Sequence, residues 1–158
     1  GRKQSALVYS RLKTGTAQDL RERGACNAFC RADENGEKLV KCEKKIPKAE
    51  GIARAAMETL LVGPDDTVLK SAIPVGTELL DINVKAAEKL CIVDLSSEFK
   101  QVKDATAADL AVYAVVDTLC QFETVDKVEI RVEGENISSL GGSADLKTTV
   151  KANYSLVK

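Results

Sequence analysis

Two apolar stretches with helical spacing stand out in this chain of 158 residues. In residues 47–64 and 104–122 the apolar positions recur every three to four residues, as they do on one face of an amphipathic helix. Asp104 or Thr106 would cap the second helix. We therefore predict two helices, with buried positions at Ile52, Ala55, Ala56, Thr59 and Leu60 in the first and at Ala108, Ala111, Val112, Val115, Leu119 and Phe122 in the second.

Strand patterns flank these helices. Residues 78–85 and 126–134 alternate apolar and polar side chains with a period of two, which is typical of a strand with one buried face. Residues 89–95 are apolar on both faces, which indicates a central strand. The short polar link before it predicts an antiparallel hairpin with 78–85. Two further strands are expected at 5–12 and 39–46.

The order of these elements is strand, strand, helix, strand, strand, helix, strand. Two helices cover one face of a five-stranded sheet better than both, so we expect an α+β fold. Its simplest form is a two-layer α/β sandwich, with two helices on one face of a mostly antiparallel sheet. We expect a main domain over 38–158. Residues 1–37, an N-terminal strand and an irregular polar segment with Cys26 and Cys30, would join it in one compact unit.

Composition excludes several classes of function. Lys and Arg total 23 and Asp and Glu 24, so the net charge is −1 and no global positive field would hold a polyanion. With three Phe, three Tyr and no Trp, stacking platforms for bases are scarce, and no nucleic-acid partner is expected. Histidine is absent, which excludes a His-based catalytic triad and removes the commonest zinc ligand.

Targeting signals are missing from the sequence. No run of 18 apolar residues occurs, so we predict no transmembrane helix, and no signal peptide is visible. The chain begins at Gly1 without an initiator Met. We therefore expect that a leader or membrane anchor precedes it in the full protein.

One stretch carries an enzyme-like cluster of oxygens. The segment LCIVDLSSEF (90–99) places Asp94, Ser96, Ser97 and Glu98 directly after an apolar strand. A Ser–Lys pair with Lys89, Lys100 or Lys103 would be a catalytic interpretation, but the stretch has neither a Ser-x-x-Lys pattern nor a nucleophile elbow. We favour a strand exit, where these side chains bind nearby backbone amides. No catalytic residue is predicted.

Two other polar clusters are better explained as turns. SSLGGSAD (138–145) has adjacent glycines like a phosphate loop, but it lacks the Gly-Lys-Ser/Thr that makes such loops specific. PDD (64–66), with Asp81 or Asp94, offers too few oxygens at defined spacing for a hard cation. No metal site and no cofactor are predicted.

Several motifs occur together and in order. The predicted first helix ends in LLVGP (60–64), IPVGT (73–77) follows, and the hairpin ends in VDLSSEF (93–99). The later VVDTLCQFETVDKVEIRVEGE (115–135) is a helix followed by an alternating strand. In these motifs the chain resembles, over residues 38–146, the GerMN domain family of sporulation and spore-germination proteins and related envelope lipoproteins.

The resemblance implies a non-enzymatic module outside the cytoplasmic membrane, similar to the ring-building folds that assemble envelope complexes during sporulation. Family members are commonly lipoproteins, so a membrane-anchored lipoprotein is expected. Its partners would be other envelope or sporulation proteins, with weak self-association through unlike surfaces. The sheet face would carry Glu129, Arg131 and Glu133, and the outer helical faces Arg54, Glu58, Asp109 and Asp117. The motif residues would be structural, namely Gly63, Pro64, Pro74, Gly76, Asp94, Ser96 and Phe99.

Five cysteines leave an alternative open. If the protein is extracytoplasmic, a disulfide from Cys42 to either Cys26 or Cys30 is expected. The same three cysteines would serve a small extracytoplasmic ligand-binding, thiol or metal domain, although a fourth zinc ligand is missing. Cys91 and Cys120 are expected to be buried as small apolar residues.

Overall fold

The fold combines two sheets and two helices in a computed structural model that describes residues 20, 24–31, 38–46, 51–64 and 69–157. The helices are α2 (Ile52–Val62) and α3 (Ala105–Leu119). The strands are β1 (Ala25–Arg31), β2 (Leu39–Lys45), β3 (Leu79–Lys85), β4 (Leu90–Leu95), β5 (Lys127–Val132), β6 (Glu135–Asn136) and β7 (Val150–Lys151), and the 3-10 turns are η1 (Ala86–Glu88), η2 (Ser97–Lys100) and η3 (Tyr154–Leu156).

The larger sheet has the order β3-β4-β5-β6, and β7 pairs with β5. β3 and β4 form the predicted antiparallel hairpin, and β4 lies between β3 and β5 as the predicted central strand. β4 and β5 run parallel, with α3 as the connection that a parallel pair requires. The remaining pairs are antiparallel. The predicted α+β class with a mostly antiparallel sheet is therefore confirmed.

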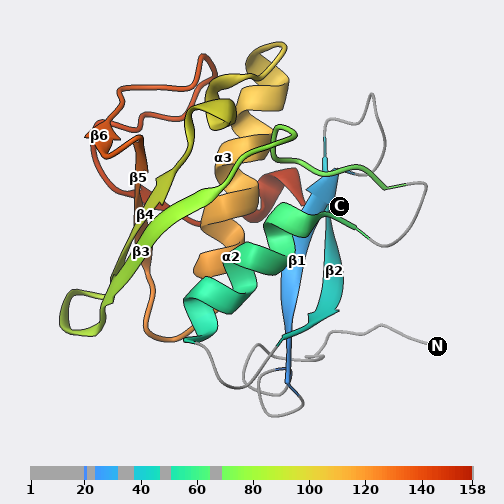
Figure 1. Cartoon of the computed structure of the whole chain (residues 1–158), viewed down its shortest axis with the longest axis vertical. Coiled ribbons are helices and arrows are strands. Elements are labelled where there is room, and N and C mark those ends of the chain that lie inside the picture. The colour runs from blue at the N-terminus through green and yellow to red at the C-terminus, as the bar shows by residue number, and fades with distance from the viewer. Residues whose placement is uncertain (1–19, 21–23, 32–37, 47–50, 65–68, 158) are drawn as a thin grey trace.

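Helix α3 is the centre of the molecule. All six apolar positions predicted for the second helix are buried, and so are others on its remaining faces, among them Leu110, Ala114 and Val116. Figure 1 shows why: α3 lies between the larger sheet on one side and the β1–β2 pair on the other. A helix with neighbours all round is apolar all round.

The predicted strand 39–46 is present as β2, but it does not join the larger sheet. It pairs antiparallel with β1 in a separate two-stranded sheet. Within the expected irregular segment 1–37, residues 25–31 are thus a strand, and this expectation was wrong. Cys26, Ala28, Phe29 and Cys30 on β1 are all buried. A strand buried on both faces shows no alternation, and small Ala and Cys residues carry little strand propensity.

A glutamine side chain covers the edge of β1 that does not pair with β2. The Gln121 amide nitrogen donates to the Asn27 carbonyl at 2.8 Å, and its oxygen accepts from the Asn27 N–H at 2.9 Å. Both backbone groups of Asn27 are thereby paired, as a neighbouring strand would pair them. The small sheet is held against the C-terminal end of α3.

The helix boundaries follow local chemistry. Asp104 caps α3, with its carboxylate accepting from the Ala107 N–H at 2.8 Å. Helix α2 ends at Gly63, whose φ of 92° suits glycine, and whose N–H donates to the carbonyls of Thr59 and Leu60.

Two of the predicted elements lie at least partly outside the described residues. The expected strand 5–12 lies outside the described residues, as does the start of the predicted helix 47–64, whose described part begins at Ile52. Among the helices that the structure describes, none combines the length and apolar character needed to cross a bilayer.

Candidate functional site

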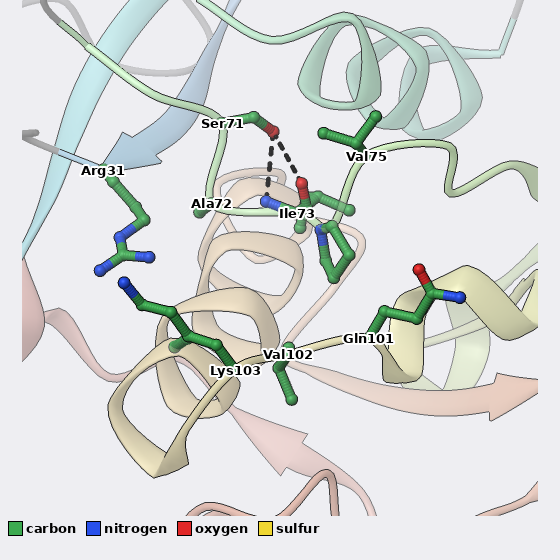
Figure 2. Close-up of a pocket in the computed structure, with 10 residues that line it drawn as sticks. Arg31, Ser71, Ala72, Ile73, Val75, Gln101, Val102 and Lys103 are labelled. Carbon is green, nitrogen blue, oxygen red and sulfur yellow. Dashed lines mark hydrogen bonds between the residues drawn. The ribbon is translucent and has the colours of Figure 1, made fainter. Parts of the chain in front are cut away.

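A pocket of about 230 Å³ opens where three distant parts of the chain meet. One wall is the end of β1 with Arg31, the second is the segment 71–75, and the third is the segment 101–103 that leads into α3. Figure 2 shows these residues around the opening. The pocket lining therefore includes Ile73, Pro74 and Val75, the first three residues of the IPVGT motif, together with residues outside the family motifs.

The motif loop is held in one conformation by its own side chains. The Ser71 hydroxyl accepts from the Ile73 N–H at 3.2 Å and donates to the Ile73 carbonyl at 3.1 Å. At the other end, the Thr77 hydroxyl donates to the Pro74 carbonyl at 2.7 Å. Gly76 between them has a φ of 89°, which favours glycine. The pocket wall is thus preformed.

The polar rim comes from outside that loop. Arg31 is held next to the loop because its backbone N–H and carbonyl bond to Lys70 at 2.8 and 3.1 Å. Lys103 is exposed two residues before α3. In Figure 2 the charged ends of Arg31 and Lys103 point toward the same space. No carboxylate is among the described residues that line the pocket, so the described lining is cationic.

The cluster in VDLSSEF lies at the exits of β4 and β5. The Ser96 hydroxyl accepts from the Glu78 N–H at 2.8 Å, and its hydrogen bond to Glu98 is the main cause that lowers the pKa of that carboxyl. The Asp94 carboxylate accepts from the Gly134 N–H at 2.9 Å. Phe99 is fully buried. Ser96 thus joins the exit of β4 to the residue before β3, as predicted for a strand exit.

The other motif residues terminate or stiffen segments. The Gly63 carbonyl accepts from the buried Lys44 ammonium at 2.9 Å, which ties the end of α2 to β2. Pro64 follows directly and is half-buried. Pro74 lines the pocket, and its carbonyl binds Thr77 as described above.

The cysteine cluster lies on the β1–β2 pair. Cys42 is directly opposite Ala28, so Cys26 and Cys30 are its diagonal neighbours. Diagonal Cα atoms are about 7–8 Å apart in such pairs, whereas a disulfide usually spans about 4.4–6.8 Å. The disulfide from Cys42 to Cys26 or Cys30 stays a prediction, and this register would have to shift to form it.

The thiol or metal alternative finds little support in this geometry. Burial raises the pKa of Cys26, although a hydrogen bond to Thr59 and the charge of Lys44 partly oppose the shift. A reactive thiol is instead exposed and has a lowered pKa. Across the described part of the chain, no three Cys, Asp or Glu side chains gather in a way that would hold a metal ion.

The glycine-rich stretch SSLGGSAD binds an anion from its own chain. The Asp109 carboxylate on α3 accepts from the backbone N–H of Ser143 at 2.8 Å and of Ala144 at 3.2 Å, and from the Ser143 hydroxyl at 2.8 Å. A Cβ on Gly142 would collide with this carboxylate and lie 2.9 Å from the Ala105 carbonyl oxygen. The stretch is therefore a loop that is hydrogen-bonded to α3 through Asp109.

A buried carboxyl was missed by sequence reasoning. Asp117, expected on an outer helical face, has no exposed surface. Its Oδ1 accepts from the Asn153 N–H at 2.9 Å, whereas Oδ2 has no partner, nor does the buried Thr118 hydroxyl. Burial raises the pKa of Asp117 to about 6. From the sequence alone, a single Asp in a helix is interpreted as exposed to solvent. Only the structure shows that several faces of this helix are covered.

Comparison with known proteins gives a consistent family. The model of the "Germane" family, described as "Sporulation and spore germination", matches residues 29–138. The spore germination protein GerM of Bacillus subtilis (strain 168) is 31% identical over 113 residues, which are 68% of this chain and 30% of that protein. The chain thus spans less than a third of the length of this relative.

Solved structures of related domains have a similar fold. The first GerMN domain of the sporulation protein GerM from Bacillus subtilis matches 80% of this chain and 96% of its own, with a TM-score of 0.66 and 25% identity. The tandem GerMN domains of the same protein match with a TM-score of 0.68 and 26% identity, over 80% of this chain and 45% of theirs. A putative lipoprotein from Clostridium perfringens shares the fold, with a TM-score of 0.58 and 23% identity over 80% of this chain and 85% of its own.

Proposed function

The chain belongs to the sporulation and spore germination family of GerMN domains, and on this premise we propose that it is a non-enzymatic module of the cell envelope that acts by binding other envelope proteins. The observation that carries the proposal is the match to an isolated GerMN domain, which extends over nearly all of that domain. The module would lie outside the cytoplasmic membrane, held there by a lipid anchor, as the family resemblance in sequence implies.

The geometry of the polar clusters supports a binding role. The serines and carboxylates that resemble a catalytic cluster are engaged in closing strand ends, as Ser96 and Asp94 do. The glycine-rich loop that resembles a phosphate site is filled by Asp109. These hydrogen bonds stabilise a rigid scaffold. Such a scaffold positions loops for recognition.

A domain exchange tests the proposal. The first GerMN domain of the Bacillus subtilis relative would be replaced by this chain, with the native domain as the positive control and a deletion of the domain as the negative control. We expect the exchange to restore sporulation and germination clearly above the deletion. A chimera that reaches the native level in the envelope yet performs no better than the deletion would contradict the proposal.

Location is tested separately. In protoplasts of cells that express the full protein, a membrane-impermeant amine reagent should label this module before lysis. Labelling that appears only after lysis would place the module in the cytoplasm and remove the envelope part of the proposal.

A further inference from the structure

We propose that the open face of the larger sheet is a contact surface for a second copy of this chain, packed face to face across a twofold axis. The inference is independent of the proposed function, because it follows from the register of the sheet and the charges on it. It rests on which residues form this face, on where their charges lie, and on two pairs of like charges that the single chain leaves opposed.

The face is defined by the alternation of side chains along the strands. Helices α2 and α3 lie on one side of the larger sheet (Figure 1), and Val93 at the centre of β4 is buried on that side. Successive side chains point to opposite faces, so Ile92 and Asp94 lie on the other side, as does Leu90. Leu90 and Ile92 accordingly belong to neither of the two apolar cores of the described chain.

Three rows of directly opposed residues cross this face. The first row contains Asp81, Asp94, Arg131 and Asn136, the second contains Asn83, Ile92 and Glu129, and the third contains Lys85, Leu90, Lys127 and Lys151. The first and third rows are four residues apart along the strands, which corresponds to about 13 Å.

The two outer rows carry opposite charge. Arg131 of the first row pairs with Glu129 of the second at 2.6 Å, which leaves the first row with its two aspartates as net charge. The third row has three lysines and no carboxylate. In the described part of the chain none of these lysines is ion-paired, and the nearby Glu88 and Asp126 lie in connecting segments outside the sheet.

Two cross-strand pairs on this face place like charges directly opposite each other. They are Asp81 with Asp94, and Lys127 with Lys151. Such pairs destabilise a sheet. A partner that brings a cation to the first pair and an anion to the second would remove both costs.

The partner must therefore carry both signs of charge about 13 Å apart. A surface of one sign, such as an anionic membrane, would be repelled by the first row. A second copy fits, because a twofold axis along the second row brings the first row of each copy over the third row of the other. Asp81 then faces Lys85 of the second copy, and Asp94 lies between Lys85 and Lys127 of the second copy. The strands of the two sheets would be nearly aligned, as in other sheets packed face to face.

The centre of this contact is apolar, and the contact is small. Ile92 would meet Ile92 of the second copy on the axis, where both side chains are removed from water. The face is three strand spacings wide, about 14 Å, and about 13 Å long. Its area is far below the roughly 800 Å² per partner of stable complexes. We therefore expect the pair to form only well above micromolar concentration.

The test measures sedimentation and the backbone amide shifts of the isotope-labelled chain from micromolar to millimolar concentration. We expect the sedimentation coefficient to rise with concentration, and the amides of Asn83, Ile92 and Glu129 in the second row to shift in parallel. Raising the salt concentration should weaken the association, because the charges of the outer rows are screened.

Charge reversals give the residue-level test. Asp81→Lys and Lys85→Glu each bring like charges together across the axis. Each should weaken self-association at least about fivefold, because two exposed ion pairs are lost per dimer. An equimolar mixture of the two variants should associate again, because each offers the charge that the other lacks.

Lys103→Glu is the matched control. It makes the same charge change just before α3, on the helix side of the molecule, and should leave self-association unchanged. All three substituted positions are exposed, so the variants are expected to fold, which thermal unfolding checks.

Several results would overturn the inference. They are amides that stay constant up to millimolar concentration, or shifts confined to the helices or the β1–β2 pair. A mixture of variants that associates no better than either alone would remove the twofold arrangement. Binding to phosphatidylglycerol vesicles through Lys85 and Lys127, by a chain that stays monomeric, would make a membrane the occupant. A domain exchange that succeeds in any of these cases would leave the proposed function standing.

Discussion

At the scale of single residues, Ser96 separates the structural from the catalytic interpretation of the VDLSSEF motif. Ser96→Ala removes the oxygen that accepts from the Glu78 N–H, so we expect a loss of about 0.5–2 kcal/mol in the free energy of unfolding. Ser97→Ala is the control, because Ser97 is exposed and bonds Glu133 through its backbone N–H, which the substitution keeps. Urea unfolding measures both. A hydrolase activity that Ser96→Ala abolishes without a change in stability would instead support catalysis.

Asp117 predicts a pH dependence of stability. Its pKa is about 6 in the folded protein, above its ordinary value of 3.8, because burial disfavours the charged form. The contribution of the neutral carboxyl is therefore complete below about pH 4 and is lost as the pH rises through 6. At one pKa unit per 1.36 kcal/mol, the loss is on the order of 1–3 kcal/mol.

The difference between the wild type and Asp117→Asn isolates this effect from other titrating groups. Asn keeps an oxygen for the Asn153 N–H and carries no charge. We expect the stability of the variant relative to the wild type to increase from pH 4 to pH 7 and then to level off, as measured by urea unfolding at each pH. A difference that is constant over this range would show that Asp117 is not titrating there.

At the scale of elements, the loop 138–145 and α3 depend on each other. Gly142→Ala should cost about 1–3 kcal/mol, because the new Cβ meets both the Asp109 carboxylate and the Ala105 carbonyl. Gly51→Ala is the matched control, since nothing lies within 4 Å of a Cβ there and its φ of −59° suits any residue. Thermal unfolding compares the two. Equal, small effects would show that the loop moves freely away from α3.

The predicted disulfide would lie within the β1–β2 pair. If Cys42 bonds Cys26 or Cys30, protein purified under oxidising conditions has three titratable thiols of its five, and the closed loop contributes about 3 kcal/mol on the chain-entropy model. Alkylation followed by intact-mass measurement counts the thiols. Ala28→Cys is a positive control, because that position is directly opposite Cys42. Five thiols in the wild type, with a bridge in the control, would rule the disulfide out.

At the scale of the whole molecule, the expected pair of unlike outer surfaces exists only in part. Glu129 and Arg131 pair on the open sheet face at 2.6 Å, in agreement with the alternation of β5. Helix α3, however, lies between the larger sheet and the β1–β2 pair (Figure 1), and Asp117 on this helix is buried, where its carboxylate accepts from the Asn153 N–H.

The distribution of exposed apolar side chains predicts weak self-association. The large apolar side chains that are exposed in the described part of the chain are Val62, Val75, Leu80 and Tyr154, from four different segments. Such scattered residues do not form an obligate interface. We expect a monomer in sedimentation velocity at micromolar concentration, with association only at much higher concentration or on a membrane, where tethering raises the effective concentration. A tight dimer at nanomolar concentration would contradict this.

The sequence by itself determined the elements whose periodicity is local. Helix α3, the hairpin β3–β4 and strand β5 were predicted within a few residues, because each repeats its apolar positions with the period of its own structure. The family was also readable, since its motifs mark where helices and strands end, at Gly63, Gly76 and Ser96. These residues act on backbone groups close to them in the chain or in the hairpin.

Only the tertiary structure decided what depends on two or more distant segments. Strand β1 has no alternation because α2 and α3 pack against it and Phe29 meets Tyr154 of the C-terminal turn. The burial of Asp117 depends on the C-terminal segment around Asn153. The pocket joins Arg31, Ile73 and Lys103, which are far apart in the sequence. A local pattern indicates which face of a segment is apolar. It does not show how many faces are covered or which side chains meet, because packing between elements determines both.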